Sequence, residues 1–97
     1  MIIVRDVFTL KFGKAKEARA LMQESRKMMA EQSENSRVLF DLVGPSYTMV
    51  LENSYDSLSH FEKSLSEIFA KPEWREWYQK FTPVVERSYR EIFSVMQ

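Results

Sequence analysis

The segment 55–81 constrains the fold most, because it predicts two short amphipathic helices in direct succession. In its first half, apolar residues at spacings of three and four share one helical face: Leu58, Phe61, Leu65, Ile68 and Phe69. Lys71-Pro72 separates the two helices, since proline has no N–H to donate and is tolerated in a first helical turn. An aromatic cluster follows: Trp74, Trp77, Tyr78 and Phe81. Both apolar faces need a cover, and the flanking segments predict that a β-sheet provides it.

These flanking segments determine the order of the elements. Residues 2–12, 37–43, 47–52 and 84–96 are rich in β-branched and aromatic residues or alternate between apolar and polar ones, as strands do. A helix is expected over 14–32, and Gly44-Pro45-Ser46 predicts a hairpin. Asn53 is expected in a turn, and Asp56 or Ser57 is expected to cap the next helix.

The order β-α-β-β-α-β predicts an α+β fold. It is the ferredoxin-like arrangement, an antiparallel four-stranded sheet with both helices on one face and, in this chain, a split second helix. The whole chain, residues 1–97, is expected to form a single domain, since 97 residues suffice for only one core.

Two helices can cover only one face of this sheet, yet the strands carry large apolar residues in both alternate sets. The uncovered face is expected to show some of the following residues: Ile3, Val7, Leu39, Val50, Tyr89 and Phe93. An apolar patch of this size does not suit a soluble monomer. The simplest cover is a second copy related by a two-fold axis, so the sequence predicts a homodimer.

Charge and composition exclude several classes of protein. Fourteen Lys and Arg residues balance fourteen Asp and Glu residues, which leaves no electrostatic footprint for nucleic acid or an anionic membrane. The absence of cysteine excludes disulfides and thiolate chemistry and fits a reducing compartment. Charge begins at Arg5, so no signal peptide is expected, and no apolar run reaches membrane-spanning length. We therefore expect a cytoplasmic protein with no nucleic-acid or membrane partner.

Two stretches resemble a known superfamily, the dimeric α+β barrels, and within it the NIPSNAP-like proteins. They are Leu42-Val43-Gly44-Pro45-Ser46-Tyr47-Thr48 and the run Ser57-Leu58, Phe61-Glu62, Lys71-Pro72-Glu73-Trp74. The resemblance, with the order of elements, covers nearly the whole chain, although its motifs are packing motifs. It implies a homodimer in which two sheets close into a barrel, with pockets between each sheet and its helices. Superfamily members include cofactor-independent monooxygenases, heme-degrading monooxygenases and proteins with no assigned activity.

The resemblance also bears on cofactors. Heme-degrading members use an asparagine, a tryptophan and a histidine at places where this chain has Asp6, Ser64 and Tyr78. This departure disfavours heme oxygenation, and no cofactor is expected. One histidine with scattered carboxylates lacks the spacing of a metal site, so no metal is expected either.

Three residues are candidates for catalysis: His60, Asp6 and Tyr78. His60 could act as a general base or an axial heme ligand, but a lone histidine on a helix is more often solvated or hydrogen-bonded. Asp6 interrupts an apolar strand and needs a partner, for which the chain offers three arginines: Arg37, Arg87 and Arg90. Such a pair is either an acid–base pair in a pocket or an ion pair at the barrel rim, and the rim is favoured.

Four aromatic residues are candidates for ligand binding: Tyr47, Tyr55, Trp74 and Tyr78. The helical aromatics could line an apolar pocket. Packing favours ordinary core instead, with Trp74 and Tyr78 or Phe81 buried and Trp77 half exposed. Tyr47, Tyr55 and Tyr89 could place hydroxyls in the pocket, or turn their polar tips to solvent or to the subunit interface.

Two functions stay open. The protein could bind or oxidise a small apolar or aromatic molecule in a small-molecule pocket, or it could be a non-catalytic interaction module whose sheet face only mediates dimerisation. RNA binding shares the order of elements, but the strand 47–52 lacks the glycine-containing aromatic signature that stacks on bases. Whether the protein is an enzyme is not decided by the sequence.

Overall fold

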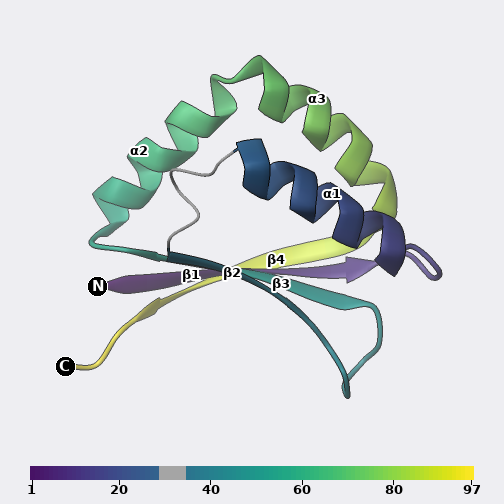
Figure 1. Ribbon diagram of the computed structural model, residues 1–97. Helices are drawn as coiled ribbons and strands as arrows, with labels where there is room; N and C mark the ends of the chain where they lie inside the picture. The colour runs from purple at the N-terminus through teal and green to yellow at the C-terminus, as the bar shows by residue number, and fades with distance from the viewer. Residues whose placement is uncertain (29–34) are drawn as a thin grey trace.

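The computed structural model describes residues 1–28 and 35–97. Its elements are β1 (Ile2–Leu10), α1 (Ala15–Met28), β2 (Ser36–Phe40), β3 (Thr48–Tyr55), α2 (Leu58–Phe69), α3 (Pro72–Phe81), the 3₁₀ turn η2 (Thr82–Val84) and β4 (Val85–Ser94) (Figure 1). The predicted order of elements and the split second helix are confirmed. Positions 29–32 of the expected first helix lie outside the described residues.

The strands form one antiparallel sheet in the order β2-β3-β1-β4, and the helices lie together on one of its faces (Figure 1). On the central strand β1, Asp6 lies opposite Arg90 of β4, and Phe8 lies opposite Met49 of β3 and Ser88 of β4. Successive side chains of a strand point to opposite faces. The even-numbered residues of β1 therefore face the helices, and the odd-numbered residues face away from them.

The core lies where α1 and α3 pack on the sheet. Leu10 and Met49 of the sheet are buried against Ala18 of α1 and Val84 of η2. Ala18 is fully buried, and its small side chain lets the backbone of α1 approach the sheet closely. Burying such apolar side chains is the main favourable term in folding, at about 25 cal/mol per Å² of apolar surface.

The aromatic residues of α3 are arranged differently from the prediction. Trp77, expected to be half exposed, is only 5% exposed. Of the two alternatives for the core, Phe81 is buried and Tyr78 is 45% exposed. The indole N–H of Trp77 points at α1 and donates a 2.6 Å hydrogen bond to the carbonyl oxygen of Leu21. This bond satisfies the polar group of the indole, so the large ring can be buried without leaving a donor unpaired.

The loop between β2 and β3 is wider than the predicted tight hairpin. β2 was expected to reach position 43 but ends at Phe40, because the next carboxylate bonds within the loop. Asp41 accepts hydrogen bonds from the backbone N–H of Ser46 at 2.8 Å and of Thr48 at 3.0 Å. The chain reverses through positive φ angles at Ser46 and Tyr47.

Other element boundaries also differ from the prediction. β1 ends at Leu10 instead of position 12, and Phe12 beyond it is 89% exposed. β3 continues to Tyr55, so Asn53, expected in a turn, is a strand residue. β4 spans Val85–Ser94, shorter than the expected 84–96.

The predicted helix boundaries around α2 and α3 are confirmed. Ser57 caps α2, since its hydroxyl oxygen accepts a hydrogen bond from the backbone N–H of His60 at 3.2 Å. Lys71 is extended, with φ −83° and ψ 124°, and Pro72 starts α3. Within the described residues, no helix combines the length and apolar character that are needed to cross a membrane.

The face of the sheet turned away from the helices, here called the outer face, carries the apolar residues predicted for it. By register these are Ile3, Val7, Leu39, Val50, Tyr89 and Phe93. Leu39 is 37% exposed, Tyr89 59% and Phe93 44%. Large apolar side chains thus remain open to solvent on the outer face of the single chain.

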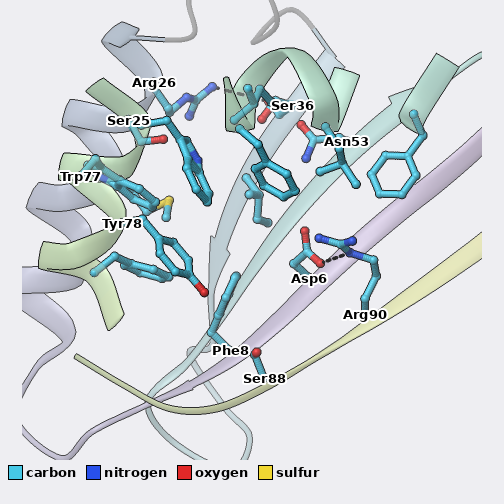
Figure 2. A pocket seen from close by; sticks show the side chains of 18 of the residues that line it. Asp6, Phe8, Ser25, Arg26, Ser36, Asn53, Trp77, Tyr78, Ser88 and Arg90 are labelled. Atoms are coloured by element: carbon cyan, nitrogen blue, oxygen red, sulfur yellow. Dashed lines mark hydrogen bonds and ion pairs between the residues drawn. The ribbon is translucent and has the colours of Figure 1, made fainter. Parts of the chain in front are cut away.

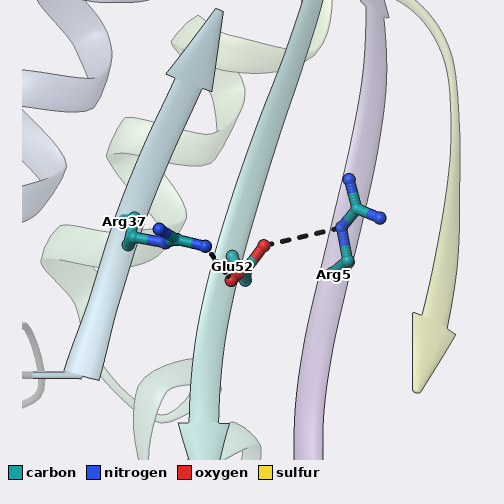
Figure 3. Close-up of polar contacts among 3 residues, drawn as sticks. All are labelled: Arg5, Arg37 and Glu52. Atoms are coloured by element: carbon teal, nitrogen blue, oxygen red, sulfur yellow. Dashed lines mark hydrogen bonds and ion pairs between the residues drawn. The ribbon is translucent and has the colours of Figure 1, made fainter. Parts of the chain in front are cut away.

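A row of charges crosses the same outer face (Figure 3). Glu52 of β3 lies between Arg37 of β2, at 2.7 Å, and Arg5 of β1, at 3.6 Å. The three residues lie side by side because the register places both Arg37 and Arg5 opposite Glu52. Cross-strand neighbours of opposite charge stabilise a sheet modestly and favour one register over a slipped one.

Candidate functional site

A cavity of about 390 Å³ lies between the helical layer and the sheet. β1 contributes Asp6 and Phe8, because only its even-numbered side chains face the helices. Leu51 and Asn53 of β3 line the floor next to them, and Arg90 of β4 completes it. The helices supply most of the apolar lining: Met22, Phe61, Leu65, Ile68, Phe69, Trp74, Trp77, Tyr78 and Phe81.

Stacked aromatic pairs on α3 form one wall of the cavity (Figure 2). Trp74 stacks on Tyr78 with ring centroids 4.7 Å apart and an interplanar angle of 17°. Trp77 stacks on Phe81 at 4.8 Å and 15°. Both pairs are four residues apart, the spacing that brings side chains together on one helical face. Phe8 meets Phe81 edge to face at 5.2 Å, which joins the aromatic wall to the floor.

Asp6 and Arg90 form an ion pair in the floor of the cavity (Figure 2). The Arg90 Nε–H donates to Asp6 Oδ1 at 2.6 Å, and the two residues face each other directly across β1 and β4. The Asp6 side chain is only 16% exposed, and that of Arg90 is 43% exposed. Of the three arginines considered from the sequence, Arg90 is the partner. The favoured rim position is not what the structure shows, because the pair lines the cavity.

Tyr55 adds a hydroxyl to the same cavity. Burial raises the pKa of Tyr55 above its ordinary value of 10.0, and the negative charge of Asp6 acts in the same direction. A hydrogen bond with the side chain of Ser64, which has a larger effect than Asp6, and the positive charge of Arg90 lower this pKa, but burial outweighs them. Tyr55 is therefore a neutral phenol at neutral pH.

A polar group lies at the end of the cavity where α1 ends and β2 begins. Arg26 donates a 3.5 Å hydrogen bond to the backbone carbonyl of Ser36, and both residues line the cavity together with the buried Ser25 (Figure 2). The cavity thus combines aromatic walls with polar groups at separate positions, the usual composition of a small-molecule site.

The structure brings some of the sequence candidates together and separates others. Asp6, Tyr55, Trp74 and Tyr78 all line the cavity. His60 does not, and its side chain is 53% exposed, with Nδ1 3.9 Å from the Asp56 carboxylate. Tyr47 packs on Phe12 instead, with ring centroids 5.2 Å apart. Residues 1–28 and 35–97 contain no cluster of three side chains that could hold a metal ion.

Several lining residues were not found from the sequence. Phe8 and Asn53 could have been placed there only with the strand register, which assigns both to the face below the helices. Ser88 lies opposite Phe8 and carries no sequence signal beyond its place in the alternation. Arg26 sits in the last turn of α1, where a basic residue is expected for helical reasons alone.

Known proteins share this architecture. The NIPSNAP family model matches residues 5–97. The structure is similar to a NIPSNAP family protein from Agrobacterium tumefaciens, with TM-score 0.91 and 18% identity over 98% of this chain and 92% of that one. An uncharacterized NIPSNAP domain protein from Burkholderia xenovorans gives TM-score 0.84 and 17% identity, covering 99% and 95% of the two chains.

The same fold extends to an oxygenase. SnoaB, a cofactor-independent oxygenase from Streptomyces nogalater, gives TM-score 0.73 and 15% identity, covering 99% of this chain and 93% of that one. At such identities the likeness shows the fold alone. A comparison with curated proteins gave no match. The family model spans nearly the whole chain, so the protein belongs to the NIPSNAP family.

Proposed function

We propose that this protein binds a small apolar or aromatic molecule in the cavity between its sheet and its helices. The observation that carries the proposal is the cavity of about 390 Å³, lined by stacked aromatic side chains and by the Asp6–Arg90 pair. Small-molecule sites have volumes of roughly 300–1,000 Å³ and combine apolar walls with a few polar groups. Asp6, Tyr55, Trp74 and Tyr78 are the proposed contacts.

A ligand screen with a matched pair of variants tests this proposal. Ser88→Phe places a ring in the cavity floor, whereas Ser59→Phe places the same ring on an exposed position of α2. Aromatic, polyketide-like and tetrapyrrole compounds that raise the melting temperature of the wild type should also stabilise S59F but not S88F. The proposal would be contradicted if no compound raised the melting temperature of the wild type, or if the same compounds raised the melting temperatures of S88F and S59F equally.

The proposal includes oxidation of the bound molecule as its enzymatic form. It is supported by the fold shared with SnoaB, described as a cofactor-independent oxygenase. Measuring oxygen consumption by the protein with each stabilising compound distinguishes oxidation from binding alone. Oxygen consumption by the wild type that S88F abolishes would support an enzyme. If no bound compound causes oxygen consumption, the protein only binds its ligand.

We also propose that the protein acts as a homodimer through its outer face. The exposure of Leu39, Tyr89 and Phe93 supports this proposal, since a partner sheet would remove their side chains from water. Sedimentation should give about twice the chain mass of 11.6 kDa, and a stable monomer would contradict it. A dimer that binds none of the screened compounds would favour the alternative, a non-catalytic interaction module.

A further inference from the structure

We propose that the Asp6–Arg90 pair recognises a planar ligand by an edge that carries a hydrogen-bond donor next to an acceptor, such as the N–H and C=O of a lactam. This inference rests on the proposed ligand-binding function of the cavity and specifies the polar group that its ligand carries.

The hydrogen bond within the pair leaves other donor and acceptor atoms of the two side chains for a ligand. The hydrogen bond between the two side chains joins Arg90 Nε to Asp6 Oδ1 at 2.6 Å. The second carboxylate oxygen and the two terminal nitrogens of the guanidinium lie outside this bond. A carboxylate only accepts and a guanidinium only donates. The pair therefore offers an acceptor and a donor side by side in the cavity floor (Figure 2).

The charges of the pair favour a neutral edge over an ion. Asp6 and Arg90 together carry no net charge. An anionic ligand group would be repelled by the carboxylate, and a cationic group would be repelled by the guanidinium. A lactam edge satisfies both partners, because its N–H donates to the carboxylate while its carbonyl accepts from the guanidinium. Hydrogen bonds to charged groups of this kind are stronger than neutral ones.

A neighbouring ring holds Arg90 in position. The Arg90 guanidinium carbon lies 5.2 Å from the ring centroid of Phe61, a buried residue of α2. This contact and the 2.6 Å hydrogen bond to Asp6 restrict the orientation of the guanidinium, so part of the recognition surface exists before a ligand arrives.

The position of Tyr78 favours a flat ligand. Its ring is 45% exposed although it stacks on Trp74, and it lines the same cavity as Asp6. Figure 2 shows the Tyr78 hydroxyl directed toward the floor of the cavity near Phe8 and Ser88. A planar ring between this wall and the floor can point one edge at the ion pair.

A matched pair of probes tests the inference directly. Isocarbostyril carries a cyclic amide edge, and N-methylisocarbostyril replaces its N–H donor by a methyl group. Binding is measured by an NMR titration that follows the indole N–H signals. The wild type should prefer isocarbostyril by roughly 10-fold, the difference expected from one hydrogen bond to a charged group.

Two substitutions separate the roles of the pair, and a third serves as control. In D6N the amide oxygen is needed to accept from the Arg90 Nε–H, so the amide NH2 group takes the place of the second carboxylate oxygen. An NH2 group cannot accept the lactam N–H, so the preference for isocarbostyril over the N-methyl probe should fall to about one. R90K keeps the charge but loses the guanidinium donors, so both probes should weaken together. D56N changes a carboxylate that is 96% exposed and should leave the preference unchanged.

The outcomes distinguish this inference from the proposal on which it rests. Binding of neither probe, with no binding of naphthalene, would overturn both. Equal binding of the two probes to the wild type, or an unchanged preference in D6N, would overturn the inference alone. Tighter binding of naphthoate than of isocarbostyril would also overturn it, because an anion would then be the preferred group.

Discussion

The indole N–H of Trp77 donates to the backbone carbonyl of Leu21 at 2.6 Å, and this buried bond ties α3 to α1 across 56 positions of the sequence. We expect Trp77→Phe to lower the free energy of unfolding by about 2–4 kcal/mol, because it removes the donor and leaves part of the ring volume empty. Trp74→Phe, at a partly buried position, should cost less. Urea denaturation of both variants measures the difference, and equal losses would show that the bond contributes little.

The two acid–arginine pairs on opposite faces of the sheet should differ in coupling energy. The Asp6 carboxylate is as shielded as that of Glu52, but Arg90 is 43% exposed and Arg37 is 66% exposed. A double-mutant cycle on Asp6 and Arg90 should give roughly 1 kcal/mol, and one on Glu52 and Arg37 a few tenths in the monomeric protein. Both cycles are therefore measured in the Y89K background, where the outer face is expected to stay open to water, and a stronger coupling for the outer-face pair there would contradict this order.

Tyr55 should make the stability depend on alkaline pH. Its pKa is raised mainly by burial, so the folded protein holds the phenol proton more tightly than the unfolded chain does. Its contribution to stability is therefore complete below the unfolded pKa of about 10. This contribution is lost as the pH rises through the higher folded value. Y55F should lose less stability than the wild type over this pH range.

Ser64 provides the control for this titration. Its hydrogen bond lowers the pKa of Tyr55, so S64A should raise that pKa further. Ultraviolet difference absorbance resolves the late-titrating phenol among the four tyrosines. Y55F should lack the late phase only, and loss of amplitude from the main phase near pH 10 instead would mean that Tyr55 is not shielded.

Charge on the outer face should dissociate the proposed dimer. Tyr89→Lys places an ammonium group among apolar residues of the outer face, where a partner sheet would have to desolvate it. Sedimentation should then show a single chain of 11.6 kDa instead of twice that mass. Leu58→Lys, at another exposed apolar position but on α2, should leave the dimer intact. A Y89K protein that keeps the dimer mass would exclude the outer face as the interface.

The backbone plan was predictable because it depends on local patterns. Pro72 marks the break between α2 and α3, and the alternation of apolar residues assigned both faces of the sheet correctly. The burial of Trp77 and the exposure of Tyr78 were not predictable, because both depend on where α1 lies across the sheet.

The candidate site was only partly predictable for the same reason. Asp6 required a partner by charge alone, but its placement beside Arg90 in the cavity follows from the register of β1 against β4. The early end of β2 depends on the carboxylate of Asp41, which bonds to the backbone of its own loop. His60 is the single histidine of the sequence but does not line the cavity, so the rarity of a residue type did not predict a place in the site.

The arrangement of α3 gives the protein its own optical probes. The chain has two tryptophans, and both line the cavity three residues apart on one helix. Trp77 is buried against α1, so its emission reports whether the helices are packed, whereas Trp74, stacked on the exposed Tyr78, lies where an occupant would quench it. Fluorescence from W74F and W77F proteins can therefore follow cavity occupancy and folding as two separate signals.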